Sequence, residues 1–116
     1  MVLDNINLSY LGLIQQAHIS IPDNSLITLV DYEPGFRICV WRFEISSNLA
    51  SKFTVRSGSN IIFEMHAGQN WGNVNSADSR LPRYISNEDE RLTIQSSVAS
   101  LDANVYIQYQ MRRVEE

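Results

Sequence analysis

The chain has 116 residues, a length that fits one domain, and 44% of them are hydrophobic, which is enough to bury a core and argues against disorder. Nine scattered Lys and Arg residues against 13 Asp and Glu give a net charge of −4, which argues against nucleic-acid binding because phosphate neutralisation needs clustered bases. The sequence shows neither a signal peptide nor an apolar run of membrane-spanning length, so we expect a protein that stays in a reducing cytoplasm and binds no membrane.

Residues 1–11 are mildly apolar and precede the first clear strand pattern. They form either a peripheral strand or an arm that adds to the sheet edge of a neighbouring subunit. The peripheral strand is preferred because it needs no partner, and residues 12–116 are then expected to form one domain. The arm makes four apolar side chains candidates for partner binding: Leu3, Ile6, Leu8 and Tyr10.

Two short apolar runs, residues 13–21 and 25–30, flank a turn signal at residues 22–24 and predict two strands. The next run, residues 36–45, is the most apolar part of the chain and carries hydrophobic side chains on both faces. Such a strand is central, bulged or covered by a second surface, and a bulge is the commonest of these explanations.

A hairpin is predicted in the middle of the chain, where residues 53–56 and 61–66 alternate apolar and polar side chains. The intervening Ser57-Gly58-Ser59-Asn60 supplies Gly and Asn where a turn needs positive φ. The alternation places Ile61, Phe63 and Met65 together on one face of the second strand.

An extended loop rich in Gly, Asn and Ser is predicted for residues 67–82, with a short strand at residues 83–85. Strands at residues 91–98 and 105–111 follow, each with an alternating pattern. The total is about seven or eight strands with no helical segment. The sequence therefore predicts an all-β protein, an antiparallel β-sandwich of which a jelly roll is one form.

Residues that could carry catalysis or bind a metal are few. Glu64 and His66 share one face of a strand, but a metal site needs more ligands, so we interpret them as exposed polar side chains. The acidic residues 87–90 lack the spacing of a calcium loop and predict a solvated turn. Cys39 lies among apolar residues and is interpreted as a small buried hydrophobe. We expect no enzyme, no metal and no cofactor.

Two aromatic residues are candidates for binding. Trp71 lies in a polar loop beside Asn70, where it either stacks on a sugar or anchors a protein partner, or else folds back over one end of the sandwich. Tyr84 follows Arg83 and packs either at a sheet edge or at a subunit contact, and Arg83 is a candidate for partner binding beside it.

Residues 36–110 resemble small β-sandwich proteins that decorate the capsids of tailed bacteriophages, also called cement proteins. The resemblance lies in the hairpin Arg56-Ser-Gly-Ser-Asn60, the turn Ser86-Asn-Glu-Asp-Glu90, the strand "LTIQSSV" and the closing strand "VYIQYQ". The loop "AGQNWGNVNSADSRLPRYI" is longer and more polar than the Gly/Pro run that the family often has there.

The resemblance implies a non-enzymatic virion protein, made in the host cytoplasm, that binds the outer surface of the expanded capsid. Its partners would be the major capsid protein and further copies of itself, as a trimer or a dimer, and it would stabilise contacts between capsid subunits. The alternative is a carbohydrate- or receptor-binding β-sandwich of a phage tail or fibre, with a sugar platform of Asn70, Trp71, Asn73 and Tyr84.

Overall fold

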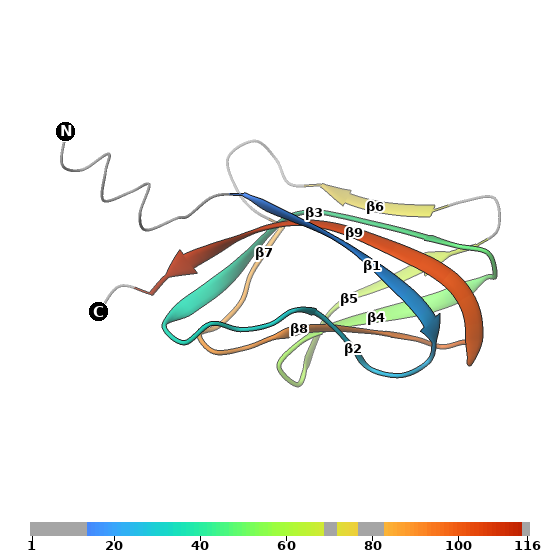
Figure 1. Cartoon of the computed structure of the whole chain (residues 1–116), viewed down its shortest axis with the longest axis horizontal. Coiled ribbons are helices and arrows are strands. Elements are labelled where there is room, and N and C mark those ends of the chain that lie inside the picture. The colour runs from blue at the N-terminus through green and yellow to red at the C-terminus, as the bar shows by residue number, and fades with distance from the viewer. Residues whose placement is uncertain (1–13, 69–71, 77–82, 115–116) are drawn as a thin grey trace.

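The computed structural model describes residues 14–68, 72–76 and 83–114, and for residues 72–76 it describes the backbone alone. These residues form nine strands in two antiparallel sheets (Figure 1). No helix in the described part of the chain is long and apolar enough to cross a membrane. The strands are β1 (Gln15–Asp23), β2 (Ile27–Val30), β3 (Phe36–Ser47), β4 (Ser51–Ser57), β5 (Asn60–Ala67), β6 (Gly72–Ser76), β7 (Tyr84–Ile85), β8 (Leu92–Ser96) and β9 (Ser100–Arg113).

The strand order is that of a jelly roll. One sheet has the order β1-β9-β3-β6, with the two-residue β7 also paired to β3, and the other has the order β2-β8-β4-β5. The pairs β1–β9, β2–β8, β3–β6 and β4–β5 are nested along the chain like the two arms of one long hairpin. Wrapping that hairpin around a core creates the remaining pairs, β3–β9 and β4–β8. The predicted antiparallel β-sandwich is confirmed, in its jelly-roll form.

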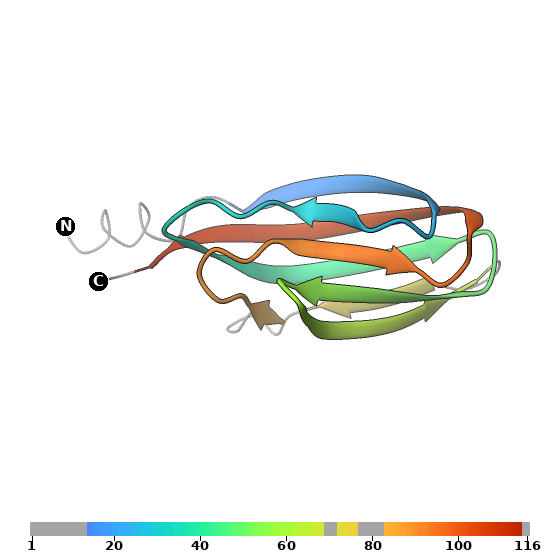
Figure 2. The ribbon, with the colours of Figure 1, turned by 90° about the horizontal axis from the view of Figure 1, so that it is seen from below.

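The core lies between the two sheets, which face each other in Figure 1; Figure 2 views them from below, with the four-stranded sheet in front. Inward side chains of both sheets are fully buried, as expected when two amphipathic sheets cover each other's apolar faces. The largest of these side chains are Phe43, Phe53, Ile21, Ile38, Leu92, Ile94 and Ile107.

The predicted bulge in β3 is present. The register between β3 and β9 shifts between Val40 and Arg42, which leaves Trp41 as the extra residue. Val40 and Phe43 are both buried although they lie three positions apart. The extra residue shifts the alternation of the strand, which explains why the sequence shows apolar side chains on both of its faces.

A second bulge corrects the prediction for Ile61. Val55 pairs with Phe63, but its neighbour Arg56 pairs with Ile61, so Ile62 is the extra residue of β5. The bulge turns Ile61 outward, and its side chain is 54% exposed instead of sharing the buried face with Met65.

Three element bounds also differ from the prediction. β6 lies within residues 67–82, where a loop was predicted because Gly and Asn have low strand propensity, and its pairing with β3 overrides that preference. β9 begins at Ser100 rather than at residue 105. β1 runs through Pro22 to Asp23, and Pro is tolerated because β1 is an edge strand.

Candidate functional site

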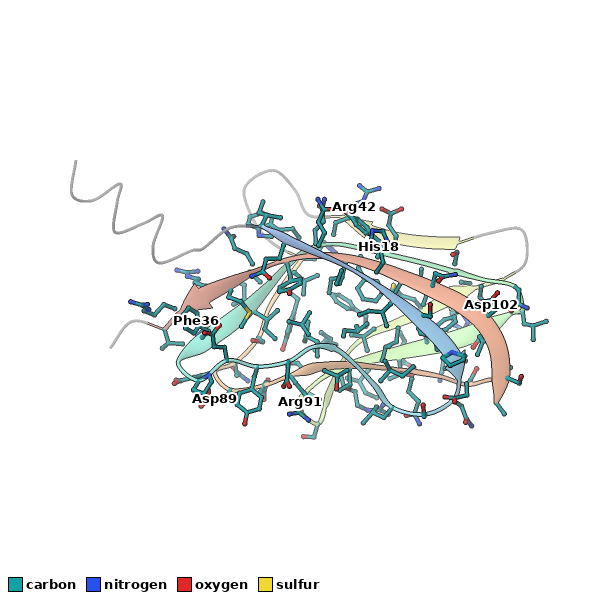
Figure 3. The ribbon with its side chains drawn as sticks, in the orientation of Figure 1. His18, Phe36, Arg42, Asp89, Arg91 and Asp102 are labelled. Carbon is teal, nitrogen blue, oxygen red and sulfur yellow. The ribbon has the colours of Figure 1, made fainter. Side chains whose placement is uncertain are left out.

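A shallow polar depression lies on the outer face of the five-stranded sheet. It has a volume of about 580 Å³ and is lined by His18 of β1, Arg42 and Glu44 of β3, and Tyr106 and Gln108 of β9. Figure 3 shows His18 and Arg42 close together on the side of this sheet that faces away from the other sheet. Three neighbouring strands therefore contribute one continuous patch of side chains.

The strand register explains why these side chains meet. Tyr106 pairs with His18 on one side and with Glu44 on the other, so the three residues form one row across the sheet. Gln108 pairs with Arg42 in the next row of the same face, since residues two apart in a strand share a face. The patch forms because β9 lies between β1 and β3 and pairs with both.

The two charges of the depression neutralise each other. Arg42 Nε donates to Glu44 Oε2 at 2.7 Å, and both side chains are partly exposed. This hydrogen bond and the carboxylate charge raise the pKa of Arg42, so the guanidinium stays charged. The pair leaves no excess charge of either sign at this position.

The aromatic and amide side chains of the depression hold one another in place. The rings of His18 and Tyr106 lie 4.8 Å apart, tilted by 42°. Gln108 Nε2 donates to the Tyr106 hydroxyl at 2.7 Å, which fixes the phenol group from the adjacent row. Nearby, the Trp41 indole N–H donates to Gln110 Oε1 at 3.1 Å. The face therefore presents ordered rings and amides.

A second surface lies where β7 joins the edge of the same sheet. The main-chain N–H of Arg83 donates to the Val40 carbonyl at 2.8 Å, while the Arg83 side chain is exposed. Tyr84 pairs with Val40 and its half-buried ring meets Phe63 edge-on, with 6.2 Å between centroids. Arg83 and Tyr84 therefore lie at the sheet edge, and their role in a subunit contact stays a prediction.

Six of the predicted partner-binding residues lie outside the described residues, and their roles stay predictions. These are Leu3, Ile6, Leu8, Tyr10, Asn70 and Trp71. Of the predicted set, Arg83 and Tyr84 lie in the described part of the chain, where they are sequence neighbours.

The residues considered above for catalysis or metal binding lie at exposed positions or in a turn. Glu64 and His66 are exposed on β5, and Glu64 forms an ion pair with Lys52 at 3.2 Å. Residues 88 and 89 form the predicted turn. In the described part of the chain, no three metal-ligating side chains lie close enough to share an ion.

Cys39 is buried, as predicted, with 3% of its surface exposed. Desolvation raises the pKa of its thiol, and this effect outweighs the opposite influence of the nearby charges of Arg112 and Arg37. The thiol is therefore protonated at neutral pH.

The polar depression was missed by the sequence reasoning. Its signal was present, because the outward positions of the strands carry amides, rings and an Arg/Glu pair with few aliphatic side chains. What the pattern did not contain was the order β1-β9-β3, which brings residues 18, 44 and 106 into one row.

No protein-family model matches the sequence, and no curated protein matches it. The fold is similar to that of a chain in the acidic stable capsid structure of Helicobacter pylori bacteriophage KHP30, with a TM-score of 0.58 and 11% sequence identity. The alignment covers 91% of this chain and 96% of that chain. At this identity, the similarity concerns the fold alone.

Proposed function

We propose that the protein is a non-enzymatic structural component of a phage capsid, and that it binds the outer surface of the expanded shell and stabilises contacts between major capsid subunits. The observation that carries the proposal is the similarity in fold to a chain of the KHP30 capsid structure over nearly the full length of both chains. Since both coverages exceed nine-tenths, the two chains have nearly equal lengths, and small size is expected of decoration proteins.

The fold suits this role physically. Two sheets that bury each other form a rigid body, and the outer faces and edges of the sheets remain available for contacts. A small contact repeated by capsid symmetry gives high avidity. Binding to the expanded shell alone would stabilise that shell by mass action.

We place the contact with the shell, or with a second copy in a trimer or a dimer, at the β7 edge. The exposed Arg83 side chain and the half-buried Tyr84 ring lie there beside Ile85, which is 39% exposed. An Arg and an aromatic ring next to an apolar side chain are typical of the centre of protein interfaces. Leu3, Ile6, Leu8 and Tyr10 are proposed as a second contact through the arm alternative for residues 1–11, in which this segment adds to a neighbour's sheet edge.

The decisive measurement is the number of copies of this protein per major capsid subunit in purified particles, determined by quantitative mass spectrometry. A fixed ratio that matches the symmetry of the capsid lattice is expected. A handful of copies would instead favour a receptor-binding component of the tail or fibre. Absence from the particles would overturn both virion functions.

A charge reversal tests the proposed contact. Arg83→Glu should weaken binding to isolated expanded shells at least about tenfold, because the substitution places a carboxylate in the contact. Lys52→Glu is the matched control, since Lys52 is exposed on the other sheet and the charge change is the same. Equal binding by the two variants would remove the β7 edge from the interface.

A further inference from the structure

We propose that the polar depression on the five-stranded sheet is a binding site for a neutral saccharide. The site consists of His18, Arg42, Glu44, Tyr106 and Gln108 and is distinct from the β7 edge. Its ligand is a hydroxyl-rich, uncharged chain of sugar rings that lies along the face of the sheet. Saccharide binding here would follow from these side chains and does not depend on the capsid function.

The ring of Tyr106 is the centre of the site. It is half-buried, and it is flanked in its row by His18 and Glu44. The neighbouring His18 ring at 4.8 Å restricts its position from one side, and the Gln108 amide holds its hydroxyl. A fixed aromatic surface with a polar rim can stack on the C–H face of a sugar ring while neighbouring groups bond to its hydroxyls.

The polar groups around Tyr106 match sugar hydroxyls in type. Gln108 uses its amide nitrogen to donate to Tyr106, so its carbonyl oxygen can accept from a ligand. Glu44 uses Oε2 to accept from Arg42, and its other carboxylate oxygen can accept as well. The site therefore offers two acceptor oxygens for sugar hydroxyls close to an aromatic ring.

The charge balance of the site favours neutral over anionic ligands. Phosphate, nucleic acid or a sulfated glycan needs an excess of positive charge. Here the guanidinium of Arg42 is already bound to the carboxylate of Glu44 at 2.7 Å, and the whole chain carries a net charge of −4. A neutral ligand meets no such mismatch.

The surroundings of the site also argue against an apolar protein partner. The exposed large hydrophobic side chains among the described residues lie outside the depression, at Ile14, Leu26, Tyr32, Leu49, Ile61 and Ile85. Protein interfaces place such side chains near their centre. The depression has rings, amides and an ion pair in their place.

The size and shape of the site point to a segment of an oligosaccharide. A volume of about 580 Å³ lies within the range of about 300–1,000 Å³ that is typical of small-molecule sites. Because the depression is shallow and lies on an outer sheet face, it covers one side of a ligand and lets a chain of sugars extend beyond it. We therefore expect binding that strengthens from monosaccharide to oligosaccharide.

The test begins with the full-length protein, fluorescently labelled, on an array of neutral and anionic glycans. The strongest neutral oligosaccharide is then titrated into the ¹⁵N-labelled protein and followed by NMR. We expect binding to neutral glycans and shifts in the amides of β1, β3 and β9 around residues 18, 44 and 106. Tyr106→Ala should reduce the affinity at least about tenfold, and Glu44→Gln, which keeps the shape of the side chain, should reduce it several-fold.

Thr54→Ala is the matched control, because Thr54 lies on the outer face of the other sheet between the buried Phe53 and Val55; its affinity should equal that of the unmodified protein. Thermal unfolding of each variant separates lost binding from lost folding, and Tyr106→Phe keeps the ring if Tyr106→Ala is unstable. The proposal is overturned by an array without neutral binders, by binding to anionic glycans alone, or by NMR shifts outside this face. None of these results bears on the copy number in particles.

Discussion

The hydroxyl of Ser86 accepts a hydrogen bond from the main-chain N–H of Ile38, with 2.8 Å between Oγ and N. The main-chain N–H of Ser86 donates in turn to the Ile38 carbonyl at 2.9 Å, and Ser86 Oγ donates to the Asn87 carbonyl at 2.9 Å. Ser86 is fully buried. One serine thus continues the pairing of β3 where the two-residue β7 ends, and it holds the Arg83–Ile85 edge against the sheet.

Ser86→Ala should destabilise the protein by about 1–3 kcal/mol, because the buried N–H of Ile38 would lose its acceptor. Urea unfolding followed by far-UV circular dichroism measures the loss. Ser59→Ala, at an exposed position of the central hairpin turn, is the control and should change the free energy of unfolding by less than about 0.5 kcal/mol. Equal stabilities of the two variants would mean that this hydrogen bond contributes nothing.

Two glycines with positive φ form a matched pair for testing the central hairpin turn. Gly58 has φ +58°, and a Cβ there would lie 3.0 Å from Glu90 Oε2, whereas Gly35 has φ +85° with open space around it. Gly35→Ala should cost about 1–2 kcal/mol from the left-handed backbone alone. Gly58→Ala should cost more, because Glu90 must move and its 2.8 Å hydrogen bond from Ser57 is disturbed.

Thermal unfolding of the two Gly→Ala variants gives the comparison. Glu90→Ala combined with Gly58→Ala separates the cost of the close contact from the backbone cost, since the carboxylate 3.0 Å from the added Cβ is then absent. A Gly58→Ala variant no less stable than Gly35→Ala would contradict a cost from the close contact with Glu90.

The thiol of Cys39 should resist modification by a disulfide reagent at pH 8 until the protein unfolds, because it is buried and its pKa is raised. The raised pKa also makes the free energy of unfolding depend on pH. Above about pH 9.0, the unfolded chain loses this proton and the folded protein keeps it, so stability falls as pH rises toward the folded pKa. Cys39→Ala should flatten this alkaline decline, as measured by urea unfolding between about pH 8 and 10.

Thr93→Val should leave the stability unchanged or raise it by up to about 1 kcal/mol. Thr93 is buried, and among the described residues its Oγ1 has no hydrogen-bond partner, so the hydroxyl loses hydration without compensation. Thr28→Val, at an exposed position of the paired strand β2, is the control. A loss of more than about 1 kcal/mol for Thr93→Val would indicate a bound water or an unrecognised partner.

The sequence alone determined the fold class, because strand alternation is a local property. Each residue's inward or outward position in residues 91–98 or 105–111 depends only on its neighbours along the strand. The Ser57–Asn60 turn and the bulge in β3 were predicted for the same reason. Local patterns failed at Gly72–Ser76 and Ser100–Asn104, where pairing with other strands decides the structure.

Only the tertiary structure decided which outward side chains become neighbours. His18 and Tyr106 are far apart along the chain, and they meet because the chain wraps so that its first and last strands pair. The edge at Arg83 and Tyr84 depends in the same way on Ser86 bonding to Ile38. Both surfaces are long-range products of strand order and register, which the period-two pattern of a single strand does not contain.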